Sequence, residues 1–478
     1  MLENKRRKYW IYGVSALFLL INSLLITFEF FWFPVIAGVL LVLWFAFFAS
    51  DKLLMLTVFL TPLSVDVNSD ALNLGIFLPS EALMILLSAV FLLKILIDNH
   101  YDLRVIKHPV TVAIFIYLIW IFFTSILSEF PIVSFKFLAT RLWFIITFYF
   151  YIMMVFKRNL SEMRQFILLY AVSLAVVVFY TIYSHSTYGF DRQVGHWVMR
   201  PFYNDHTSYG AALAIYTIAL FALLFENKYS RQKKLSILLL FVIIAVALFL
   251  SYSRAAWLSV VVAIIAYFTL RLKVKYYWIV IATLIMVGGF FAFEHEIMIK
   301  LNKNKQDSST DFVEHVQSIS NISTDASNLE RLNRWASAFK LFQERPIVGW
   351  GPGTYQFVYA PFQNSRDRTI ISTNAGDGGN AHSEYIGPLA EAGVVGLLSL
   401  LGIIFSVLIY GRRNYFATKN KEIIILNFIA LLGLISYYIH GFLNNFLDTD
   451  KLSVPFWGLT AMIVAINIFH LEEEKPKE

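Results

Sequence analysis

Arginines and histidines beside apolar segments are the residues of this 478-residue chain best suited to chemistry. The planar arginine side chain binds phosphate oxygens through two parallel hydrogen bonds, and a neutral histidine can take a proton from a hydroxyl group. Seven arginines fall in connections that we place on the outer side of a membrane: Arg192, Arg200, Arg254, Arg331, Arg334, Arg366 and Arg368. An outer face has no ATP, so these residues favour a reaction whose donor is already activated, such as a lipid-linked pyrophosphate.

Two arginines lie where a positive charge is unusual. Arg254 follows the tight connection Ser251–Ser253 between two apolar runs, and positive charge there opposes the usual cytoplasmic bias. The alternative is an arginine that reaches to the membrane interface without a function. Arg141 lies inside an apolar run, where a charge is costly and is either functional or paired. Its predicted partner is Glu391, with Glu81 and Glu129 as alternatives.

His382 is the candidate general base. It stands in Asn380–Tyr385 (NAHSEY), just before an apolar run, and the positive end of a helix there disfavours the imidazolium form. The glycine-rich stretch 376–379 before it allows close approach of a substrate. The alternative is a capping or hydrogen-bonding histidine. Position alone does not select it, because four other histidines are predicted on the same side: His185, His196, His206 and His440.

Composition excludes several other classes of function. There is no cysteine, so disulfides, thiolate catalysis and cysteine-ligated metals are absent. No phosphate-binding glycine loop, Gly-x-Ser-x-Gly elbow or His-Glu-x-x-His zinc motif occurs. We expect no metal and no cofactor. The net charge of +7 is assigned to lysines and arginines in cytoplasmic loops, and not to a nucleic-acid partner.

Hydropathy predicts an all-α, polytopic transmembrane bundle of about 12–14 spans. Hydrophobic types make up 58% of the chain and charged types 15%, against about 25% charged residues in soluble domains. Most apolar runs approach the roughly 20 residues that cross a bilayer. Leu53–Leu63 is too short, and is either re-entrant or completed by flanking residues. The fourteen runs are Trp10–Ile26, Phe33–Ala49, Leu53–Leu63, Ala82–Ile97, Val110–Leu127, Phe135–Phe156, Phe166–Tyr183, Thr207–Phe225, Leu235–Leu250, Ala255–Leu270, Tyr276–Phe293, Tyr385–Tyr410, Ile423–Phe442 and Val454–Phe469.

Charge predicts the topology. If every run crosses and the N-terminus is cytoplasmic, nearly all clusters of lysine and arginine fall inside. Both termini are then cytoplasmic, in a bacterial inner membrane, and the basic start Met1–Lys8 leads into a retained first span rather than a signal peptide. The expected units are a bundle over 1–293 with an outer loop at 184–206, a large periplasmic loop over 294–382, and C-terminal helices with a short cytoplasmic tail over 383–478.

The large loop contains one predicted helix. Ser327–Glu330 has the pattern of a capping box, which opens a helix. Arg331 and Arg334 are three residues apart and share a face. An apolar stripe follows at helical spacing, at Leu329, Leu332, Ala336, Phe339 and Phe342.

The order of these motifs resembles the O-antigen ligase and polymerase superfamily. That family has Arg, Trp, then P-x-x-G-x-G, then a His ahead of L-x-E-x-G-x-x-G-L. This chain has Arg334-Trp335, Arg345–Gly353 (RPIVGWGPG), His382 and Leu389–Leu397 (LAEAGVVGL). Upstream, Arg200–Asn204 (RPFYN) and Ser253-Arg254 are similar to two further family elements. His206 is a departure, because many members have a different polar residue there.

The resemblance implies a metal-independent glycosyltransferase that inverts the anomeric carbon. Its expected donor is a glycan on undecaprenyl pyrophosphate, and its acceptor a hydroxyl of lipid A–core or of another glycan, on the periplasmic side of the lipid bilayer. Carried over by motif, His382 is the base, and Arg200, Arg254, Arg331 and Arg334 bind pyrophosphate. Arg141, His206, Glu384 and Glu391 are supporting residues. An O-antigen ligase is the leading interpretation.

Three alternatives stay open at the level of the sequence. A repeat-unit polymerase of the same superfamily and an enzyme that transfers glycan to protein hydroxyls share the same histidine and arginines. A lipid-linked glycan transporter belongs to a different class. It predicts paired halves with broken helices, and the two halves of this chain show no similarity.

Overall fold

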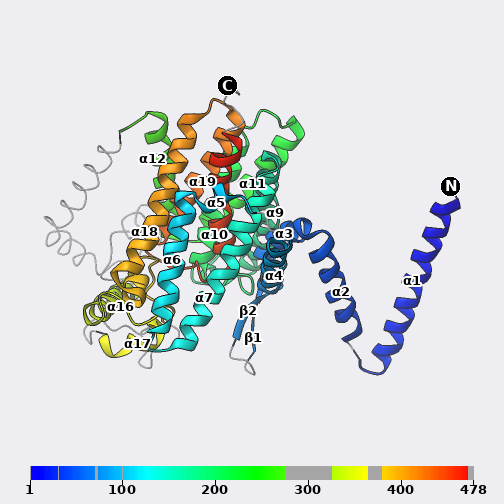
Figure 1. Cartoon of the computed structure of the whole chain (residues 1–478), viewed down its shortest axis with the longest axis horizontal. Helices are drawn as coiled ribbons and strands as arrows, with labels where there is room; N and C mark the ends of the chain where they lie inside the picture. Colours follow the sequence, from blue (N-terminus) through cyan, green and yellow to red (C-terminus); the bar gives the residue numbers. More distant parts are fainter. Residues whose placement is uncertain are drawn as a thin grey trace.

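The computed structural model describes residues 2–30, 32–69, 74–98, 101–275, 326–363 and 379–471, and it is almost entirely helical. Among these residues, ten helices are long and apolar enough to cross a membrane, which confirms the predicted all-α polytopic class (Figure 1). The predicted run Tyr276–Phe293 lies outside the described residues. The ten are α4 (Ser80–Asp98), α6 (Pro109–Ile126), a continuous α7–η2–α8 (Pro131–Phe156), α9 (Leu160–Thr187), α10 (His206–Leu223), α11 (Arg231–Leu250), α12 (Arg254–Arg271), α18 (Ile386–Ala417), α19 (Lys421–His440) and α20–η6 (Asp450–His470).

Shorter elements complete the described part of the chain. The N-terminal helices project away from the bundle (Figure 1). A small antiparallel hairpin, which the sequence patterns did not predict, pairs β1 with β2 from Val65 opposite Leu78 to Ser69 opposite Leu74. The remaining elements are α1 (Leu2–Thr27), α2 (Trp32–Phe48), α3 (Ser50–Leu60), the 3₁₀ turn η1 (Thr61–Leu63), β1 (Val65–Ser69), β2 (Leu74–Leu78), α5 (Leu103–Ile106), the 3₁₀ turn η3 (Val194–His196), α16 (Ala326–Glu344), α17 (Tyr355–Val358) and the 3₁₀ turn η4 (Ala360–Phe362).

The short segment α3–η1 joins the two ends of the bundle. With 11 residues, α3 rises about 16 Å, roughly half of the hydrocarbon thickness. Near its start, Asp51 pairs with Arg158 beyond α8 at 2.6 Å, and after η1 the Ser64 hydroxyl donates to Asp450 at the start of α20. Because the far end of α20 reaches α8 through the His470 ring and the Phe156 carbonyl, these two contacts lie at opposite ends of the bundle. The segment from Asp51 to Ser64 therefore extends from one end of the bundle toward the other, and whether it crosses the membrane stays a prediction.

The core is built around α20. All of its residues from Asp450 to Ala465 are buried, and it packs against α19, α10, α8 and η2. Large side chains fill the space between these helices, among them Trp457, and Tyr170 stacked on Tyr216 with ring centroids 4.4 Å apart. The buried apolar surface of α20 stabilises this packing.

Helix α18 is broken near its start, and a glycine-rich loop binds to the break. Gly393 has φ 70° and ψ −171°, a conformation that essentially only glycine adopts. The break releases backbone groups that must find partners. The carbonyls of residues 390 and 391 accept from Trp350 and Gly351, the carbonyl of 392 accepts from the Trp120 indole, and the Val394 N–H donates to the Pro346 carbonyl.

Glycines are required where the loop meets the helix. A Cβ on Gly349 would lie 2.3 Å from the Glu391 carbonyl carbon, and one on Gly393 would lie 2.0 Å from the Ile347 oxygen. The motif P-x-x-G-x-G and the motif E-x-G-x-x-G are therefore two halves of one backbone interface. This interface ties the end of α16 to the start of α18.

We expect Gly393→Ala to destabilise the protein strongly. The alanine would need a backbone conformation that essentially only glycine adopts, which costs about 1–3 kcal/mol, and its Cβ would clash with the Ile347 carbonyl. The matched control is Gly402→Ala in the same helix, where a Cβ meets nothing within 4 Å and alanine favours the helix. Thermal unfolding in detergent measures both variants, and equal melting temperatures would refute this account of the break.

Candidate active site

His382 is held by the long helix α16. The Arg334 guanidinium donates to the Asn380 carbonyl at 3.0 Å, and the Trp335 indole donates to the Ala381 carbonyl at 3.0 Å. The backbone N–H of His382 donates to the Asn380 side chain at 3.0 Å. His382 itself has φ 48°, a strained conformation for a non-glycine residue that only a well-fixed environment maintains.

Arg334 is part of the framework as well as a candidate ligand. It is buried, its Nε donates to Glu330 at 2.7 Å, and its guanidinium lies over the Tyr359 ring at 5.6 Å. Two of its donor groups therefore position Glu330 and Asn380. Arg331, on the same helix, is half-buried, and its Nε donates to the Leu443 carbonyl in the loop after α19 at 3.2 Å.

The predicted apolar stripe of α16 faces outward. Leu332 and Phe339 are exposed, whereas Asn333, Ser337 and Leu341 on the other face are buried. Asn333 donates to the Gln363 side chain at 3.2 Å, so the buried face is stabilised by polar contacts to the segment after α17. Hydrophobicity alone therefore does not select the packed face of α16. Ser327 and Leu329 have no described side chains, so the capping box stays untested.

Further histidines gather beside His382, which sequence patterns did not resolve. His206 begins α10 and stacks on His196, with ring centroids 4.2 Å apart at 17°. His440 ends α19, is fully buried, and neither of its ring nitrogens has a hydrogen-bond partner among the described residues. Asp205 and Arg331 both lie close enough to act electrostatically on His382 and on His440. His440 lies near the end of a predicted apolar run, on the side predicted for His382. That position is the feature of the sequence that could have indicated its place near His382.

The surroundings of His382 keep its imidazole neutral. The pKa of His382 is lowered from 6.5 to about 3, first by burial and then by the positive charges of Arg334 and Arg331, against a smaller opposing effect of Asp205. The sequence predicted a neutral ring from the helix N-terminus, but α18 begins only at Ile386. A neutral ring has an unprotonated nitrogen, which a general base requires.

The two other predicted pyrophosphate ligands, Arg200 and Arg254, belong to other parts of the chain. Arg200 is exposed in the loop before α10, and its Nε donates to the Asn204 carbonyl at 3.1 Å. Arg254 is the first residue of α12, where Ser253 packs against Gly210 of α10. Arg334 binds the Asn380 carbonyl and Arg331 acts electrostatically on His382, while the binding of pyrophosphate by all four arginines stays a prediction.

Arg141 and Glu384 are both buried, and both bind the loop after α19. One Glu384 oxygen accepts from the Tyr437 hydroxyl at 2.6 Å and from the N–H groups of Phe446 and Leu447 at 2.7 and 2.9 Å. Arg141 donates to the Leu447 carbonyl. The Glu384 N–H donates to the Gly441 carbonyl at 2.8 Å, so this bond joins the His382 segment to the end of α19.

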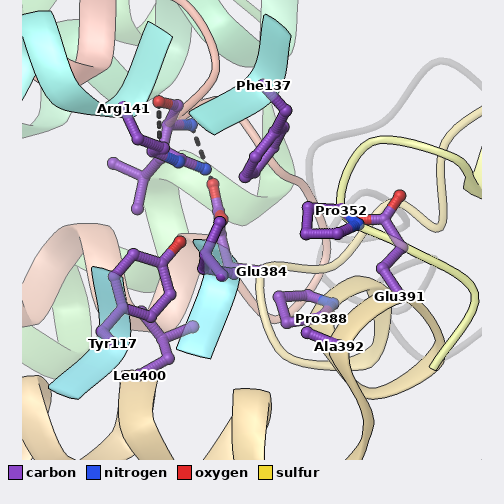
Figure 2. A pocket seen from close by; sticks show the side chains of 11 residues that line it. Tyr117, Phe137, Arg141, Pro352, Glu384, Pro388, Glu391, Ala392 and Leu400 are labelled. Atoms are coloured by element: carbon purple, nitrogen blue, oxygen red, sulfur yellow. Dashed lines mark hydrogen bonds between the residues drawn. The ribbon is translucent and has the colours of Figure 1, made fainter. Parts of the chain in front are cut away.

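The predicted ion pair between Arg141 and Glu391 does not form. Glu391 accepts from the Tyr355 N–H at 3.0 Å and supports the glycine-rich loop, while Glu129 pairs with Arg345 at 2.9 Å and Glu81 accepts from the Phe77 N–H at 3.0 Å. In Figure 2, Glu384 lies between Arg141 on one side and Pro352 and Glu391 on the other. These four residues line a small cavity of about 20 Å³. Such a volume holds about one water molecule.

Comparison with known families supports the resemblance found in the sequence. A family model described as O-antigen ligase matches residues 239–401. This region is similar to the O-antigen ligase superfamily, in agreement with the motifs found in the sequence. It contains Arg254, Arg331, Arg334 and His382, together with Glu384 and Glu391, while Arg141, Arg200, His206 and His440 lie outside it. No curated protein matches the chain.

The family match and the apolar helices together indicate a multi-pass membrane protein of a glycan-transferring family. No group of three His, Asp or Glu side chains suited to a metal ion occurs within the described ranges.

We expect Arg331→Gln to raise the pKa of His382 toward its ordinary value of 6.5. The substitution removes a positive charge that opposes protonation, while glutamine can still donate to the Leu443 carbonyl. The measurement is a pH titration of ring signals in histidine-labelled protein, with His382→Gln used to assign the resonance. An unchanged pKa would mean that burial and Arg334 keep the ring neutral without Arg331.

Proposed function

We propose that this protein transfers a glycan from undecaprenyl pyrophosphate to an acceptor hydroxyl on the periplasmic side of the inner membrane. The acceptor that we favour is a sugar of lipid A–core, which makes the protein an O-antigen ligase. The proposal draws on the family match for the class of reaction, and on the neutral His382 beside two arginines of α16 for the chemistry. That juxtaposition is the observation that carries it.

The proposed step needs one base and a stabilised leaving group. The acceptor oxygen attacks the anomeric carbon and forms the new glycosidic bond, and its proton passes to the neutral ring of His382. The bond between the anomeric carbon and the pyrophosphate oxygen breaks, and undecaprenyl pyrophosphate leaves with the electron pair. In-line attack inverts the anomeric carbon. Arg331, Arg334, Arg200 and Arg254 are the proposed partners of the negative charge that grows on the leaving group.

Binding of the donor would prepare the base. Arg334 and Arg331 lower the pKa of His382 while their charges are uncompensated. A pyrophosphate placed between them would offset those charges and raise the pKa, so His382 becomes a stronger base when the donor is bound. His206 and His440 also lie close enough to Arg331 to feel its charge, and we propose that they face the acceptor.

We expect His382→Ala and His382→Gln to lose transfer, by about 100-fold or more if general-base catalysis alone is removed. The assay uses purified protein, undecaprenyl pyrophosphate-linked glycan, and lipid A–core present or absent. Donor binding is measured on the same samples, because retained binding separates lost chemistry from lost folding. Transfer at wild-type rates in either variant would remove His382 as the base.

The same assay separates the candidate functions. One product that depends on lipid A–core supports the ligase, whereas a ladder of longer carrier-linked glycans without lipid A–core supports a repeat-unit polymerase. Transfer to a protein hydroxyl would require a protein acceptor in the reaction. Translocation of the donor across vesicles without any transfer would indicate a transporter.

We expect Arg254→Lys to reduce transfer strongly, because an ammonium group cannot replace the two-pronged contact of a guanidinium with phosphate. The matched control is Arg271→Lys, which changes the last residue of the same helix instead of the first. If Arg254→Lys works as well as the control, Arg254 is an interface anchor with no role in donor binding.

A further inference from the structure

We propose that a groove at the end of the bundle opposite His382 binds the headgroup of an anionic phospholipid. The groove lies between the start of α9 and the connection from α10 to α11, and it encloses about 620 Å³. This volume is within the range of ligand-binding sites, roughly 300–1,000 Å³. We call it the α9–α11 groove, and its lining residues are Ser161, Arg164, Gln165, Leu168, Leu169, Val172, Lys228, Tyr229, Ser230 and Lys233.

One face of α9 supplies the floor of the groove, and its character changes along the helix. The residues at 161, 164, 165, 168, 169 and 172 recur at the spacing of one helical face. The first three are polar and stand in the opening turns, while Leu168, Leu169 and Val172 continue the face deeper into the bundle's apolar length. This sequence of polar and then apolar contacts matches a phospholipid, whose charged headgroup lies above its acyl chains.

Positive charge dominates the mouth of the groove. Arg164 pairs with Glu422 and approaches Glu226 at 3.7 Å, and Lys228 pairs with Glu422. Lys233 adds a third positive charge, which these two carboxylates do not balance. Lys228 is 67% exposed, so it can turn toward a phosphate without disrupting the core. Basic pockets between transmembrane helices are suited to anionic lipid headgroups.

Tyr229 gives an independent indication of a ligand. Its side chain is 9% exposed and lines the groove, and its buried hydroxyl has no hydrogen-bond partner among the described residues. Lys233 lies over its ring at 4.1 Å. A buried hydroxyl without a partner is unfavourable, and a phosphate oxygen at the mouth of the groove would accept its hydrogen bond.

The groove is separate from the candidate active site. His206 begins α10 beside His382, whereas the groove residues follow the other end of that helix at Leu223. Eighteen helical residues span about 27 Å. The proposal therefore does not depend on the proposed glycan transfer.

The test measures lipid binding to the full-length protein by native mass spectrometry after delipidation. The probes are phosphatidylglycerol, phosphatidylcholine with the same acyl chains, and inorganic phosphate. The groove variants are Lys228→Gln with Lys233→Gln, and Tyr229→Phe. The matched control is Arg412→Gln with Arg413→Gln, which removes two exposed charges from the end of α18. Thermal unfolding checks that every variant is folded.

We expect wild type to retain phosphatidylglycerol in preference to phosphatidylcholine. Each lysine removed from the groove should weaken phosphatidylglycerol binding by about fivefold, Tyr229→Phe should weaken it less, and the control should bind as wild type. Equal binding of the two lipids to wild type would overturn the proposal. Equal binding of phosphatidylglycerol by the double lysine variant and the control would also overturn it. Inorganic phosphate that binds as tightly as the lipid would assign the groove to a free anion instead.

Discussion

The backbone interface between the glycine-rich loop and the broken start of α18 is the constraint on which the candidate site depends. A helix break exposes N–H and C=O groups that cannot remain unpaired inside a protein. Here the loop supplies partners for them, and it approaches closely enough that Gly349 and Gly393 cannot carry a side chain. The loop begins where α16 ends, so the same contacts place α16 over the segment that contains His382. Arg334 and Trp335 then bind that segment through its carbonyls.

Arg334 has both a structural and an electrostatic effect on the segment that contains His382. Arg334 holds Asn380 and Glu330, and at the same time its positive charge keeps the pKa of His382 low. Glu384 is close to His382 in sequence, but its carboxylate is occupied by three hydrogen bonds that fix the loop after α19. A carboxylate bound in this way positions its neighbours and is a poor candidate for proton transfer. The supporting role predicted for Glu384 therefore has a structural explanation.

Polar contacts also decide how α16 packs. Its apolar residues Leu332 and Phe339 remain exposed, while Asn333 and Arg334 are buried and hydrogen-bonded. Burial of polar groups is tolerated only when their hydrogen bonds are made, and the segments 355–363 and 379–382 make them. The apolar face that remains outside is suited to a lipid environment, in keeping with a loop that works beside a membrane.

Much of the architecture was predictable from the sequence because the bilayer imposes a length. Apolar runs of about 20 residues predicted the described spans, and the order of short motifs predicted the family. The sequence also singled out His382, Arg331 and Arg334. Only the tertiary structure decided that the segment after α3 binds the start of α20, that Arg141 binds the Leu447 carbonyl instead of Glu391, and that His440 lies near Arg331 of the candidate site. These outcomes depend on contacts between residues hundreds of positions apart, such as Ser64 and Asp450, and hydrophobic periodicity carries no information about such pairs.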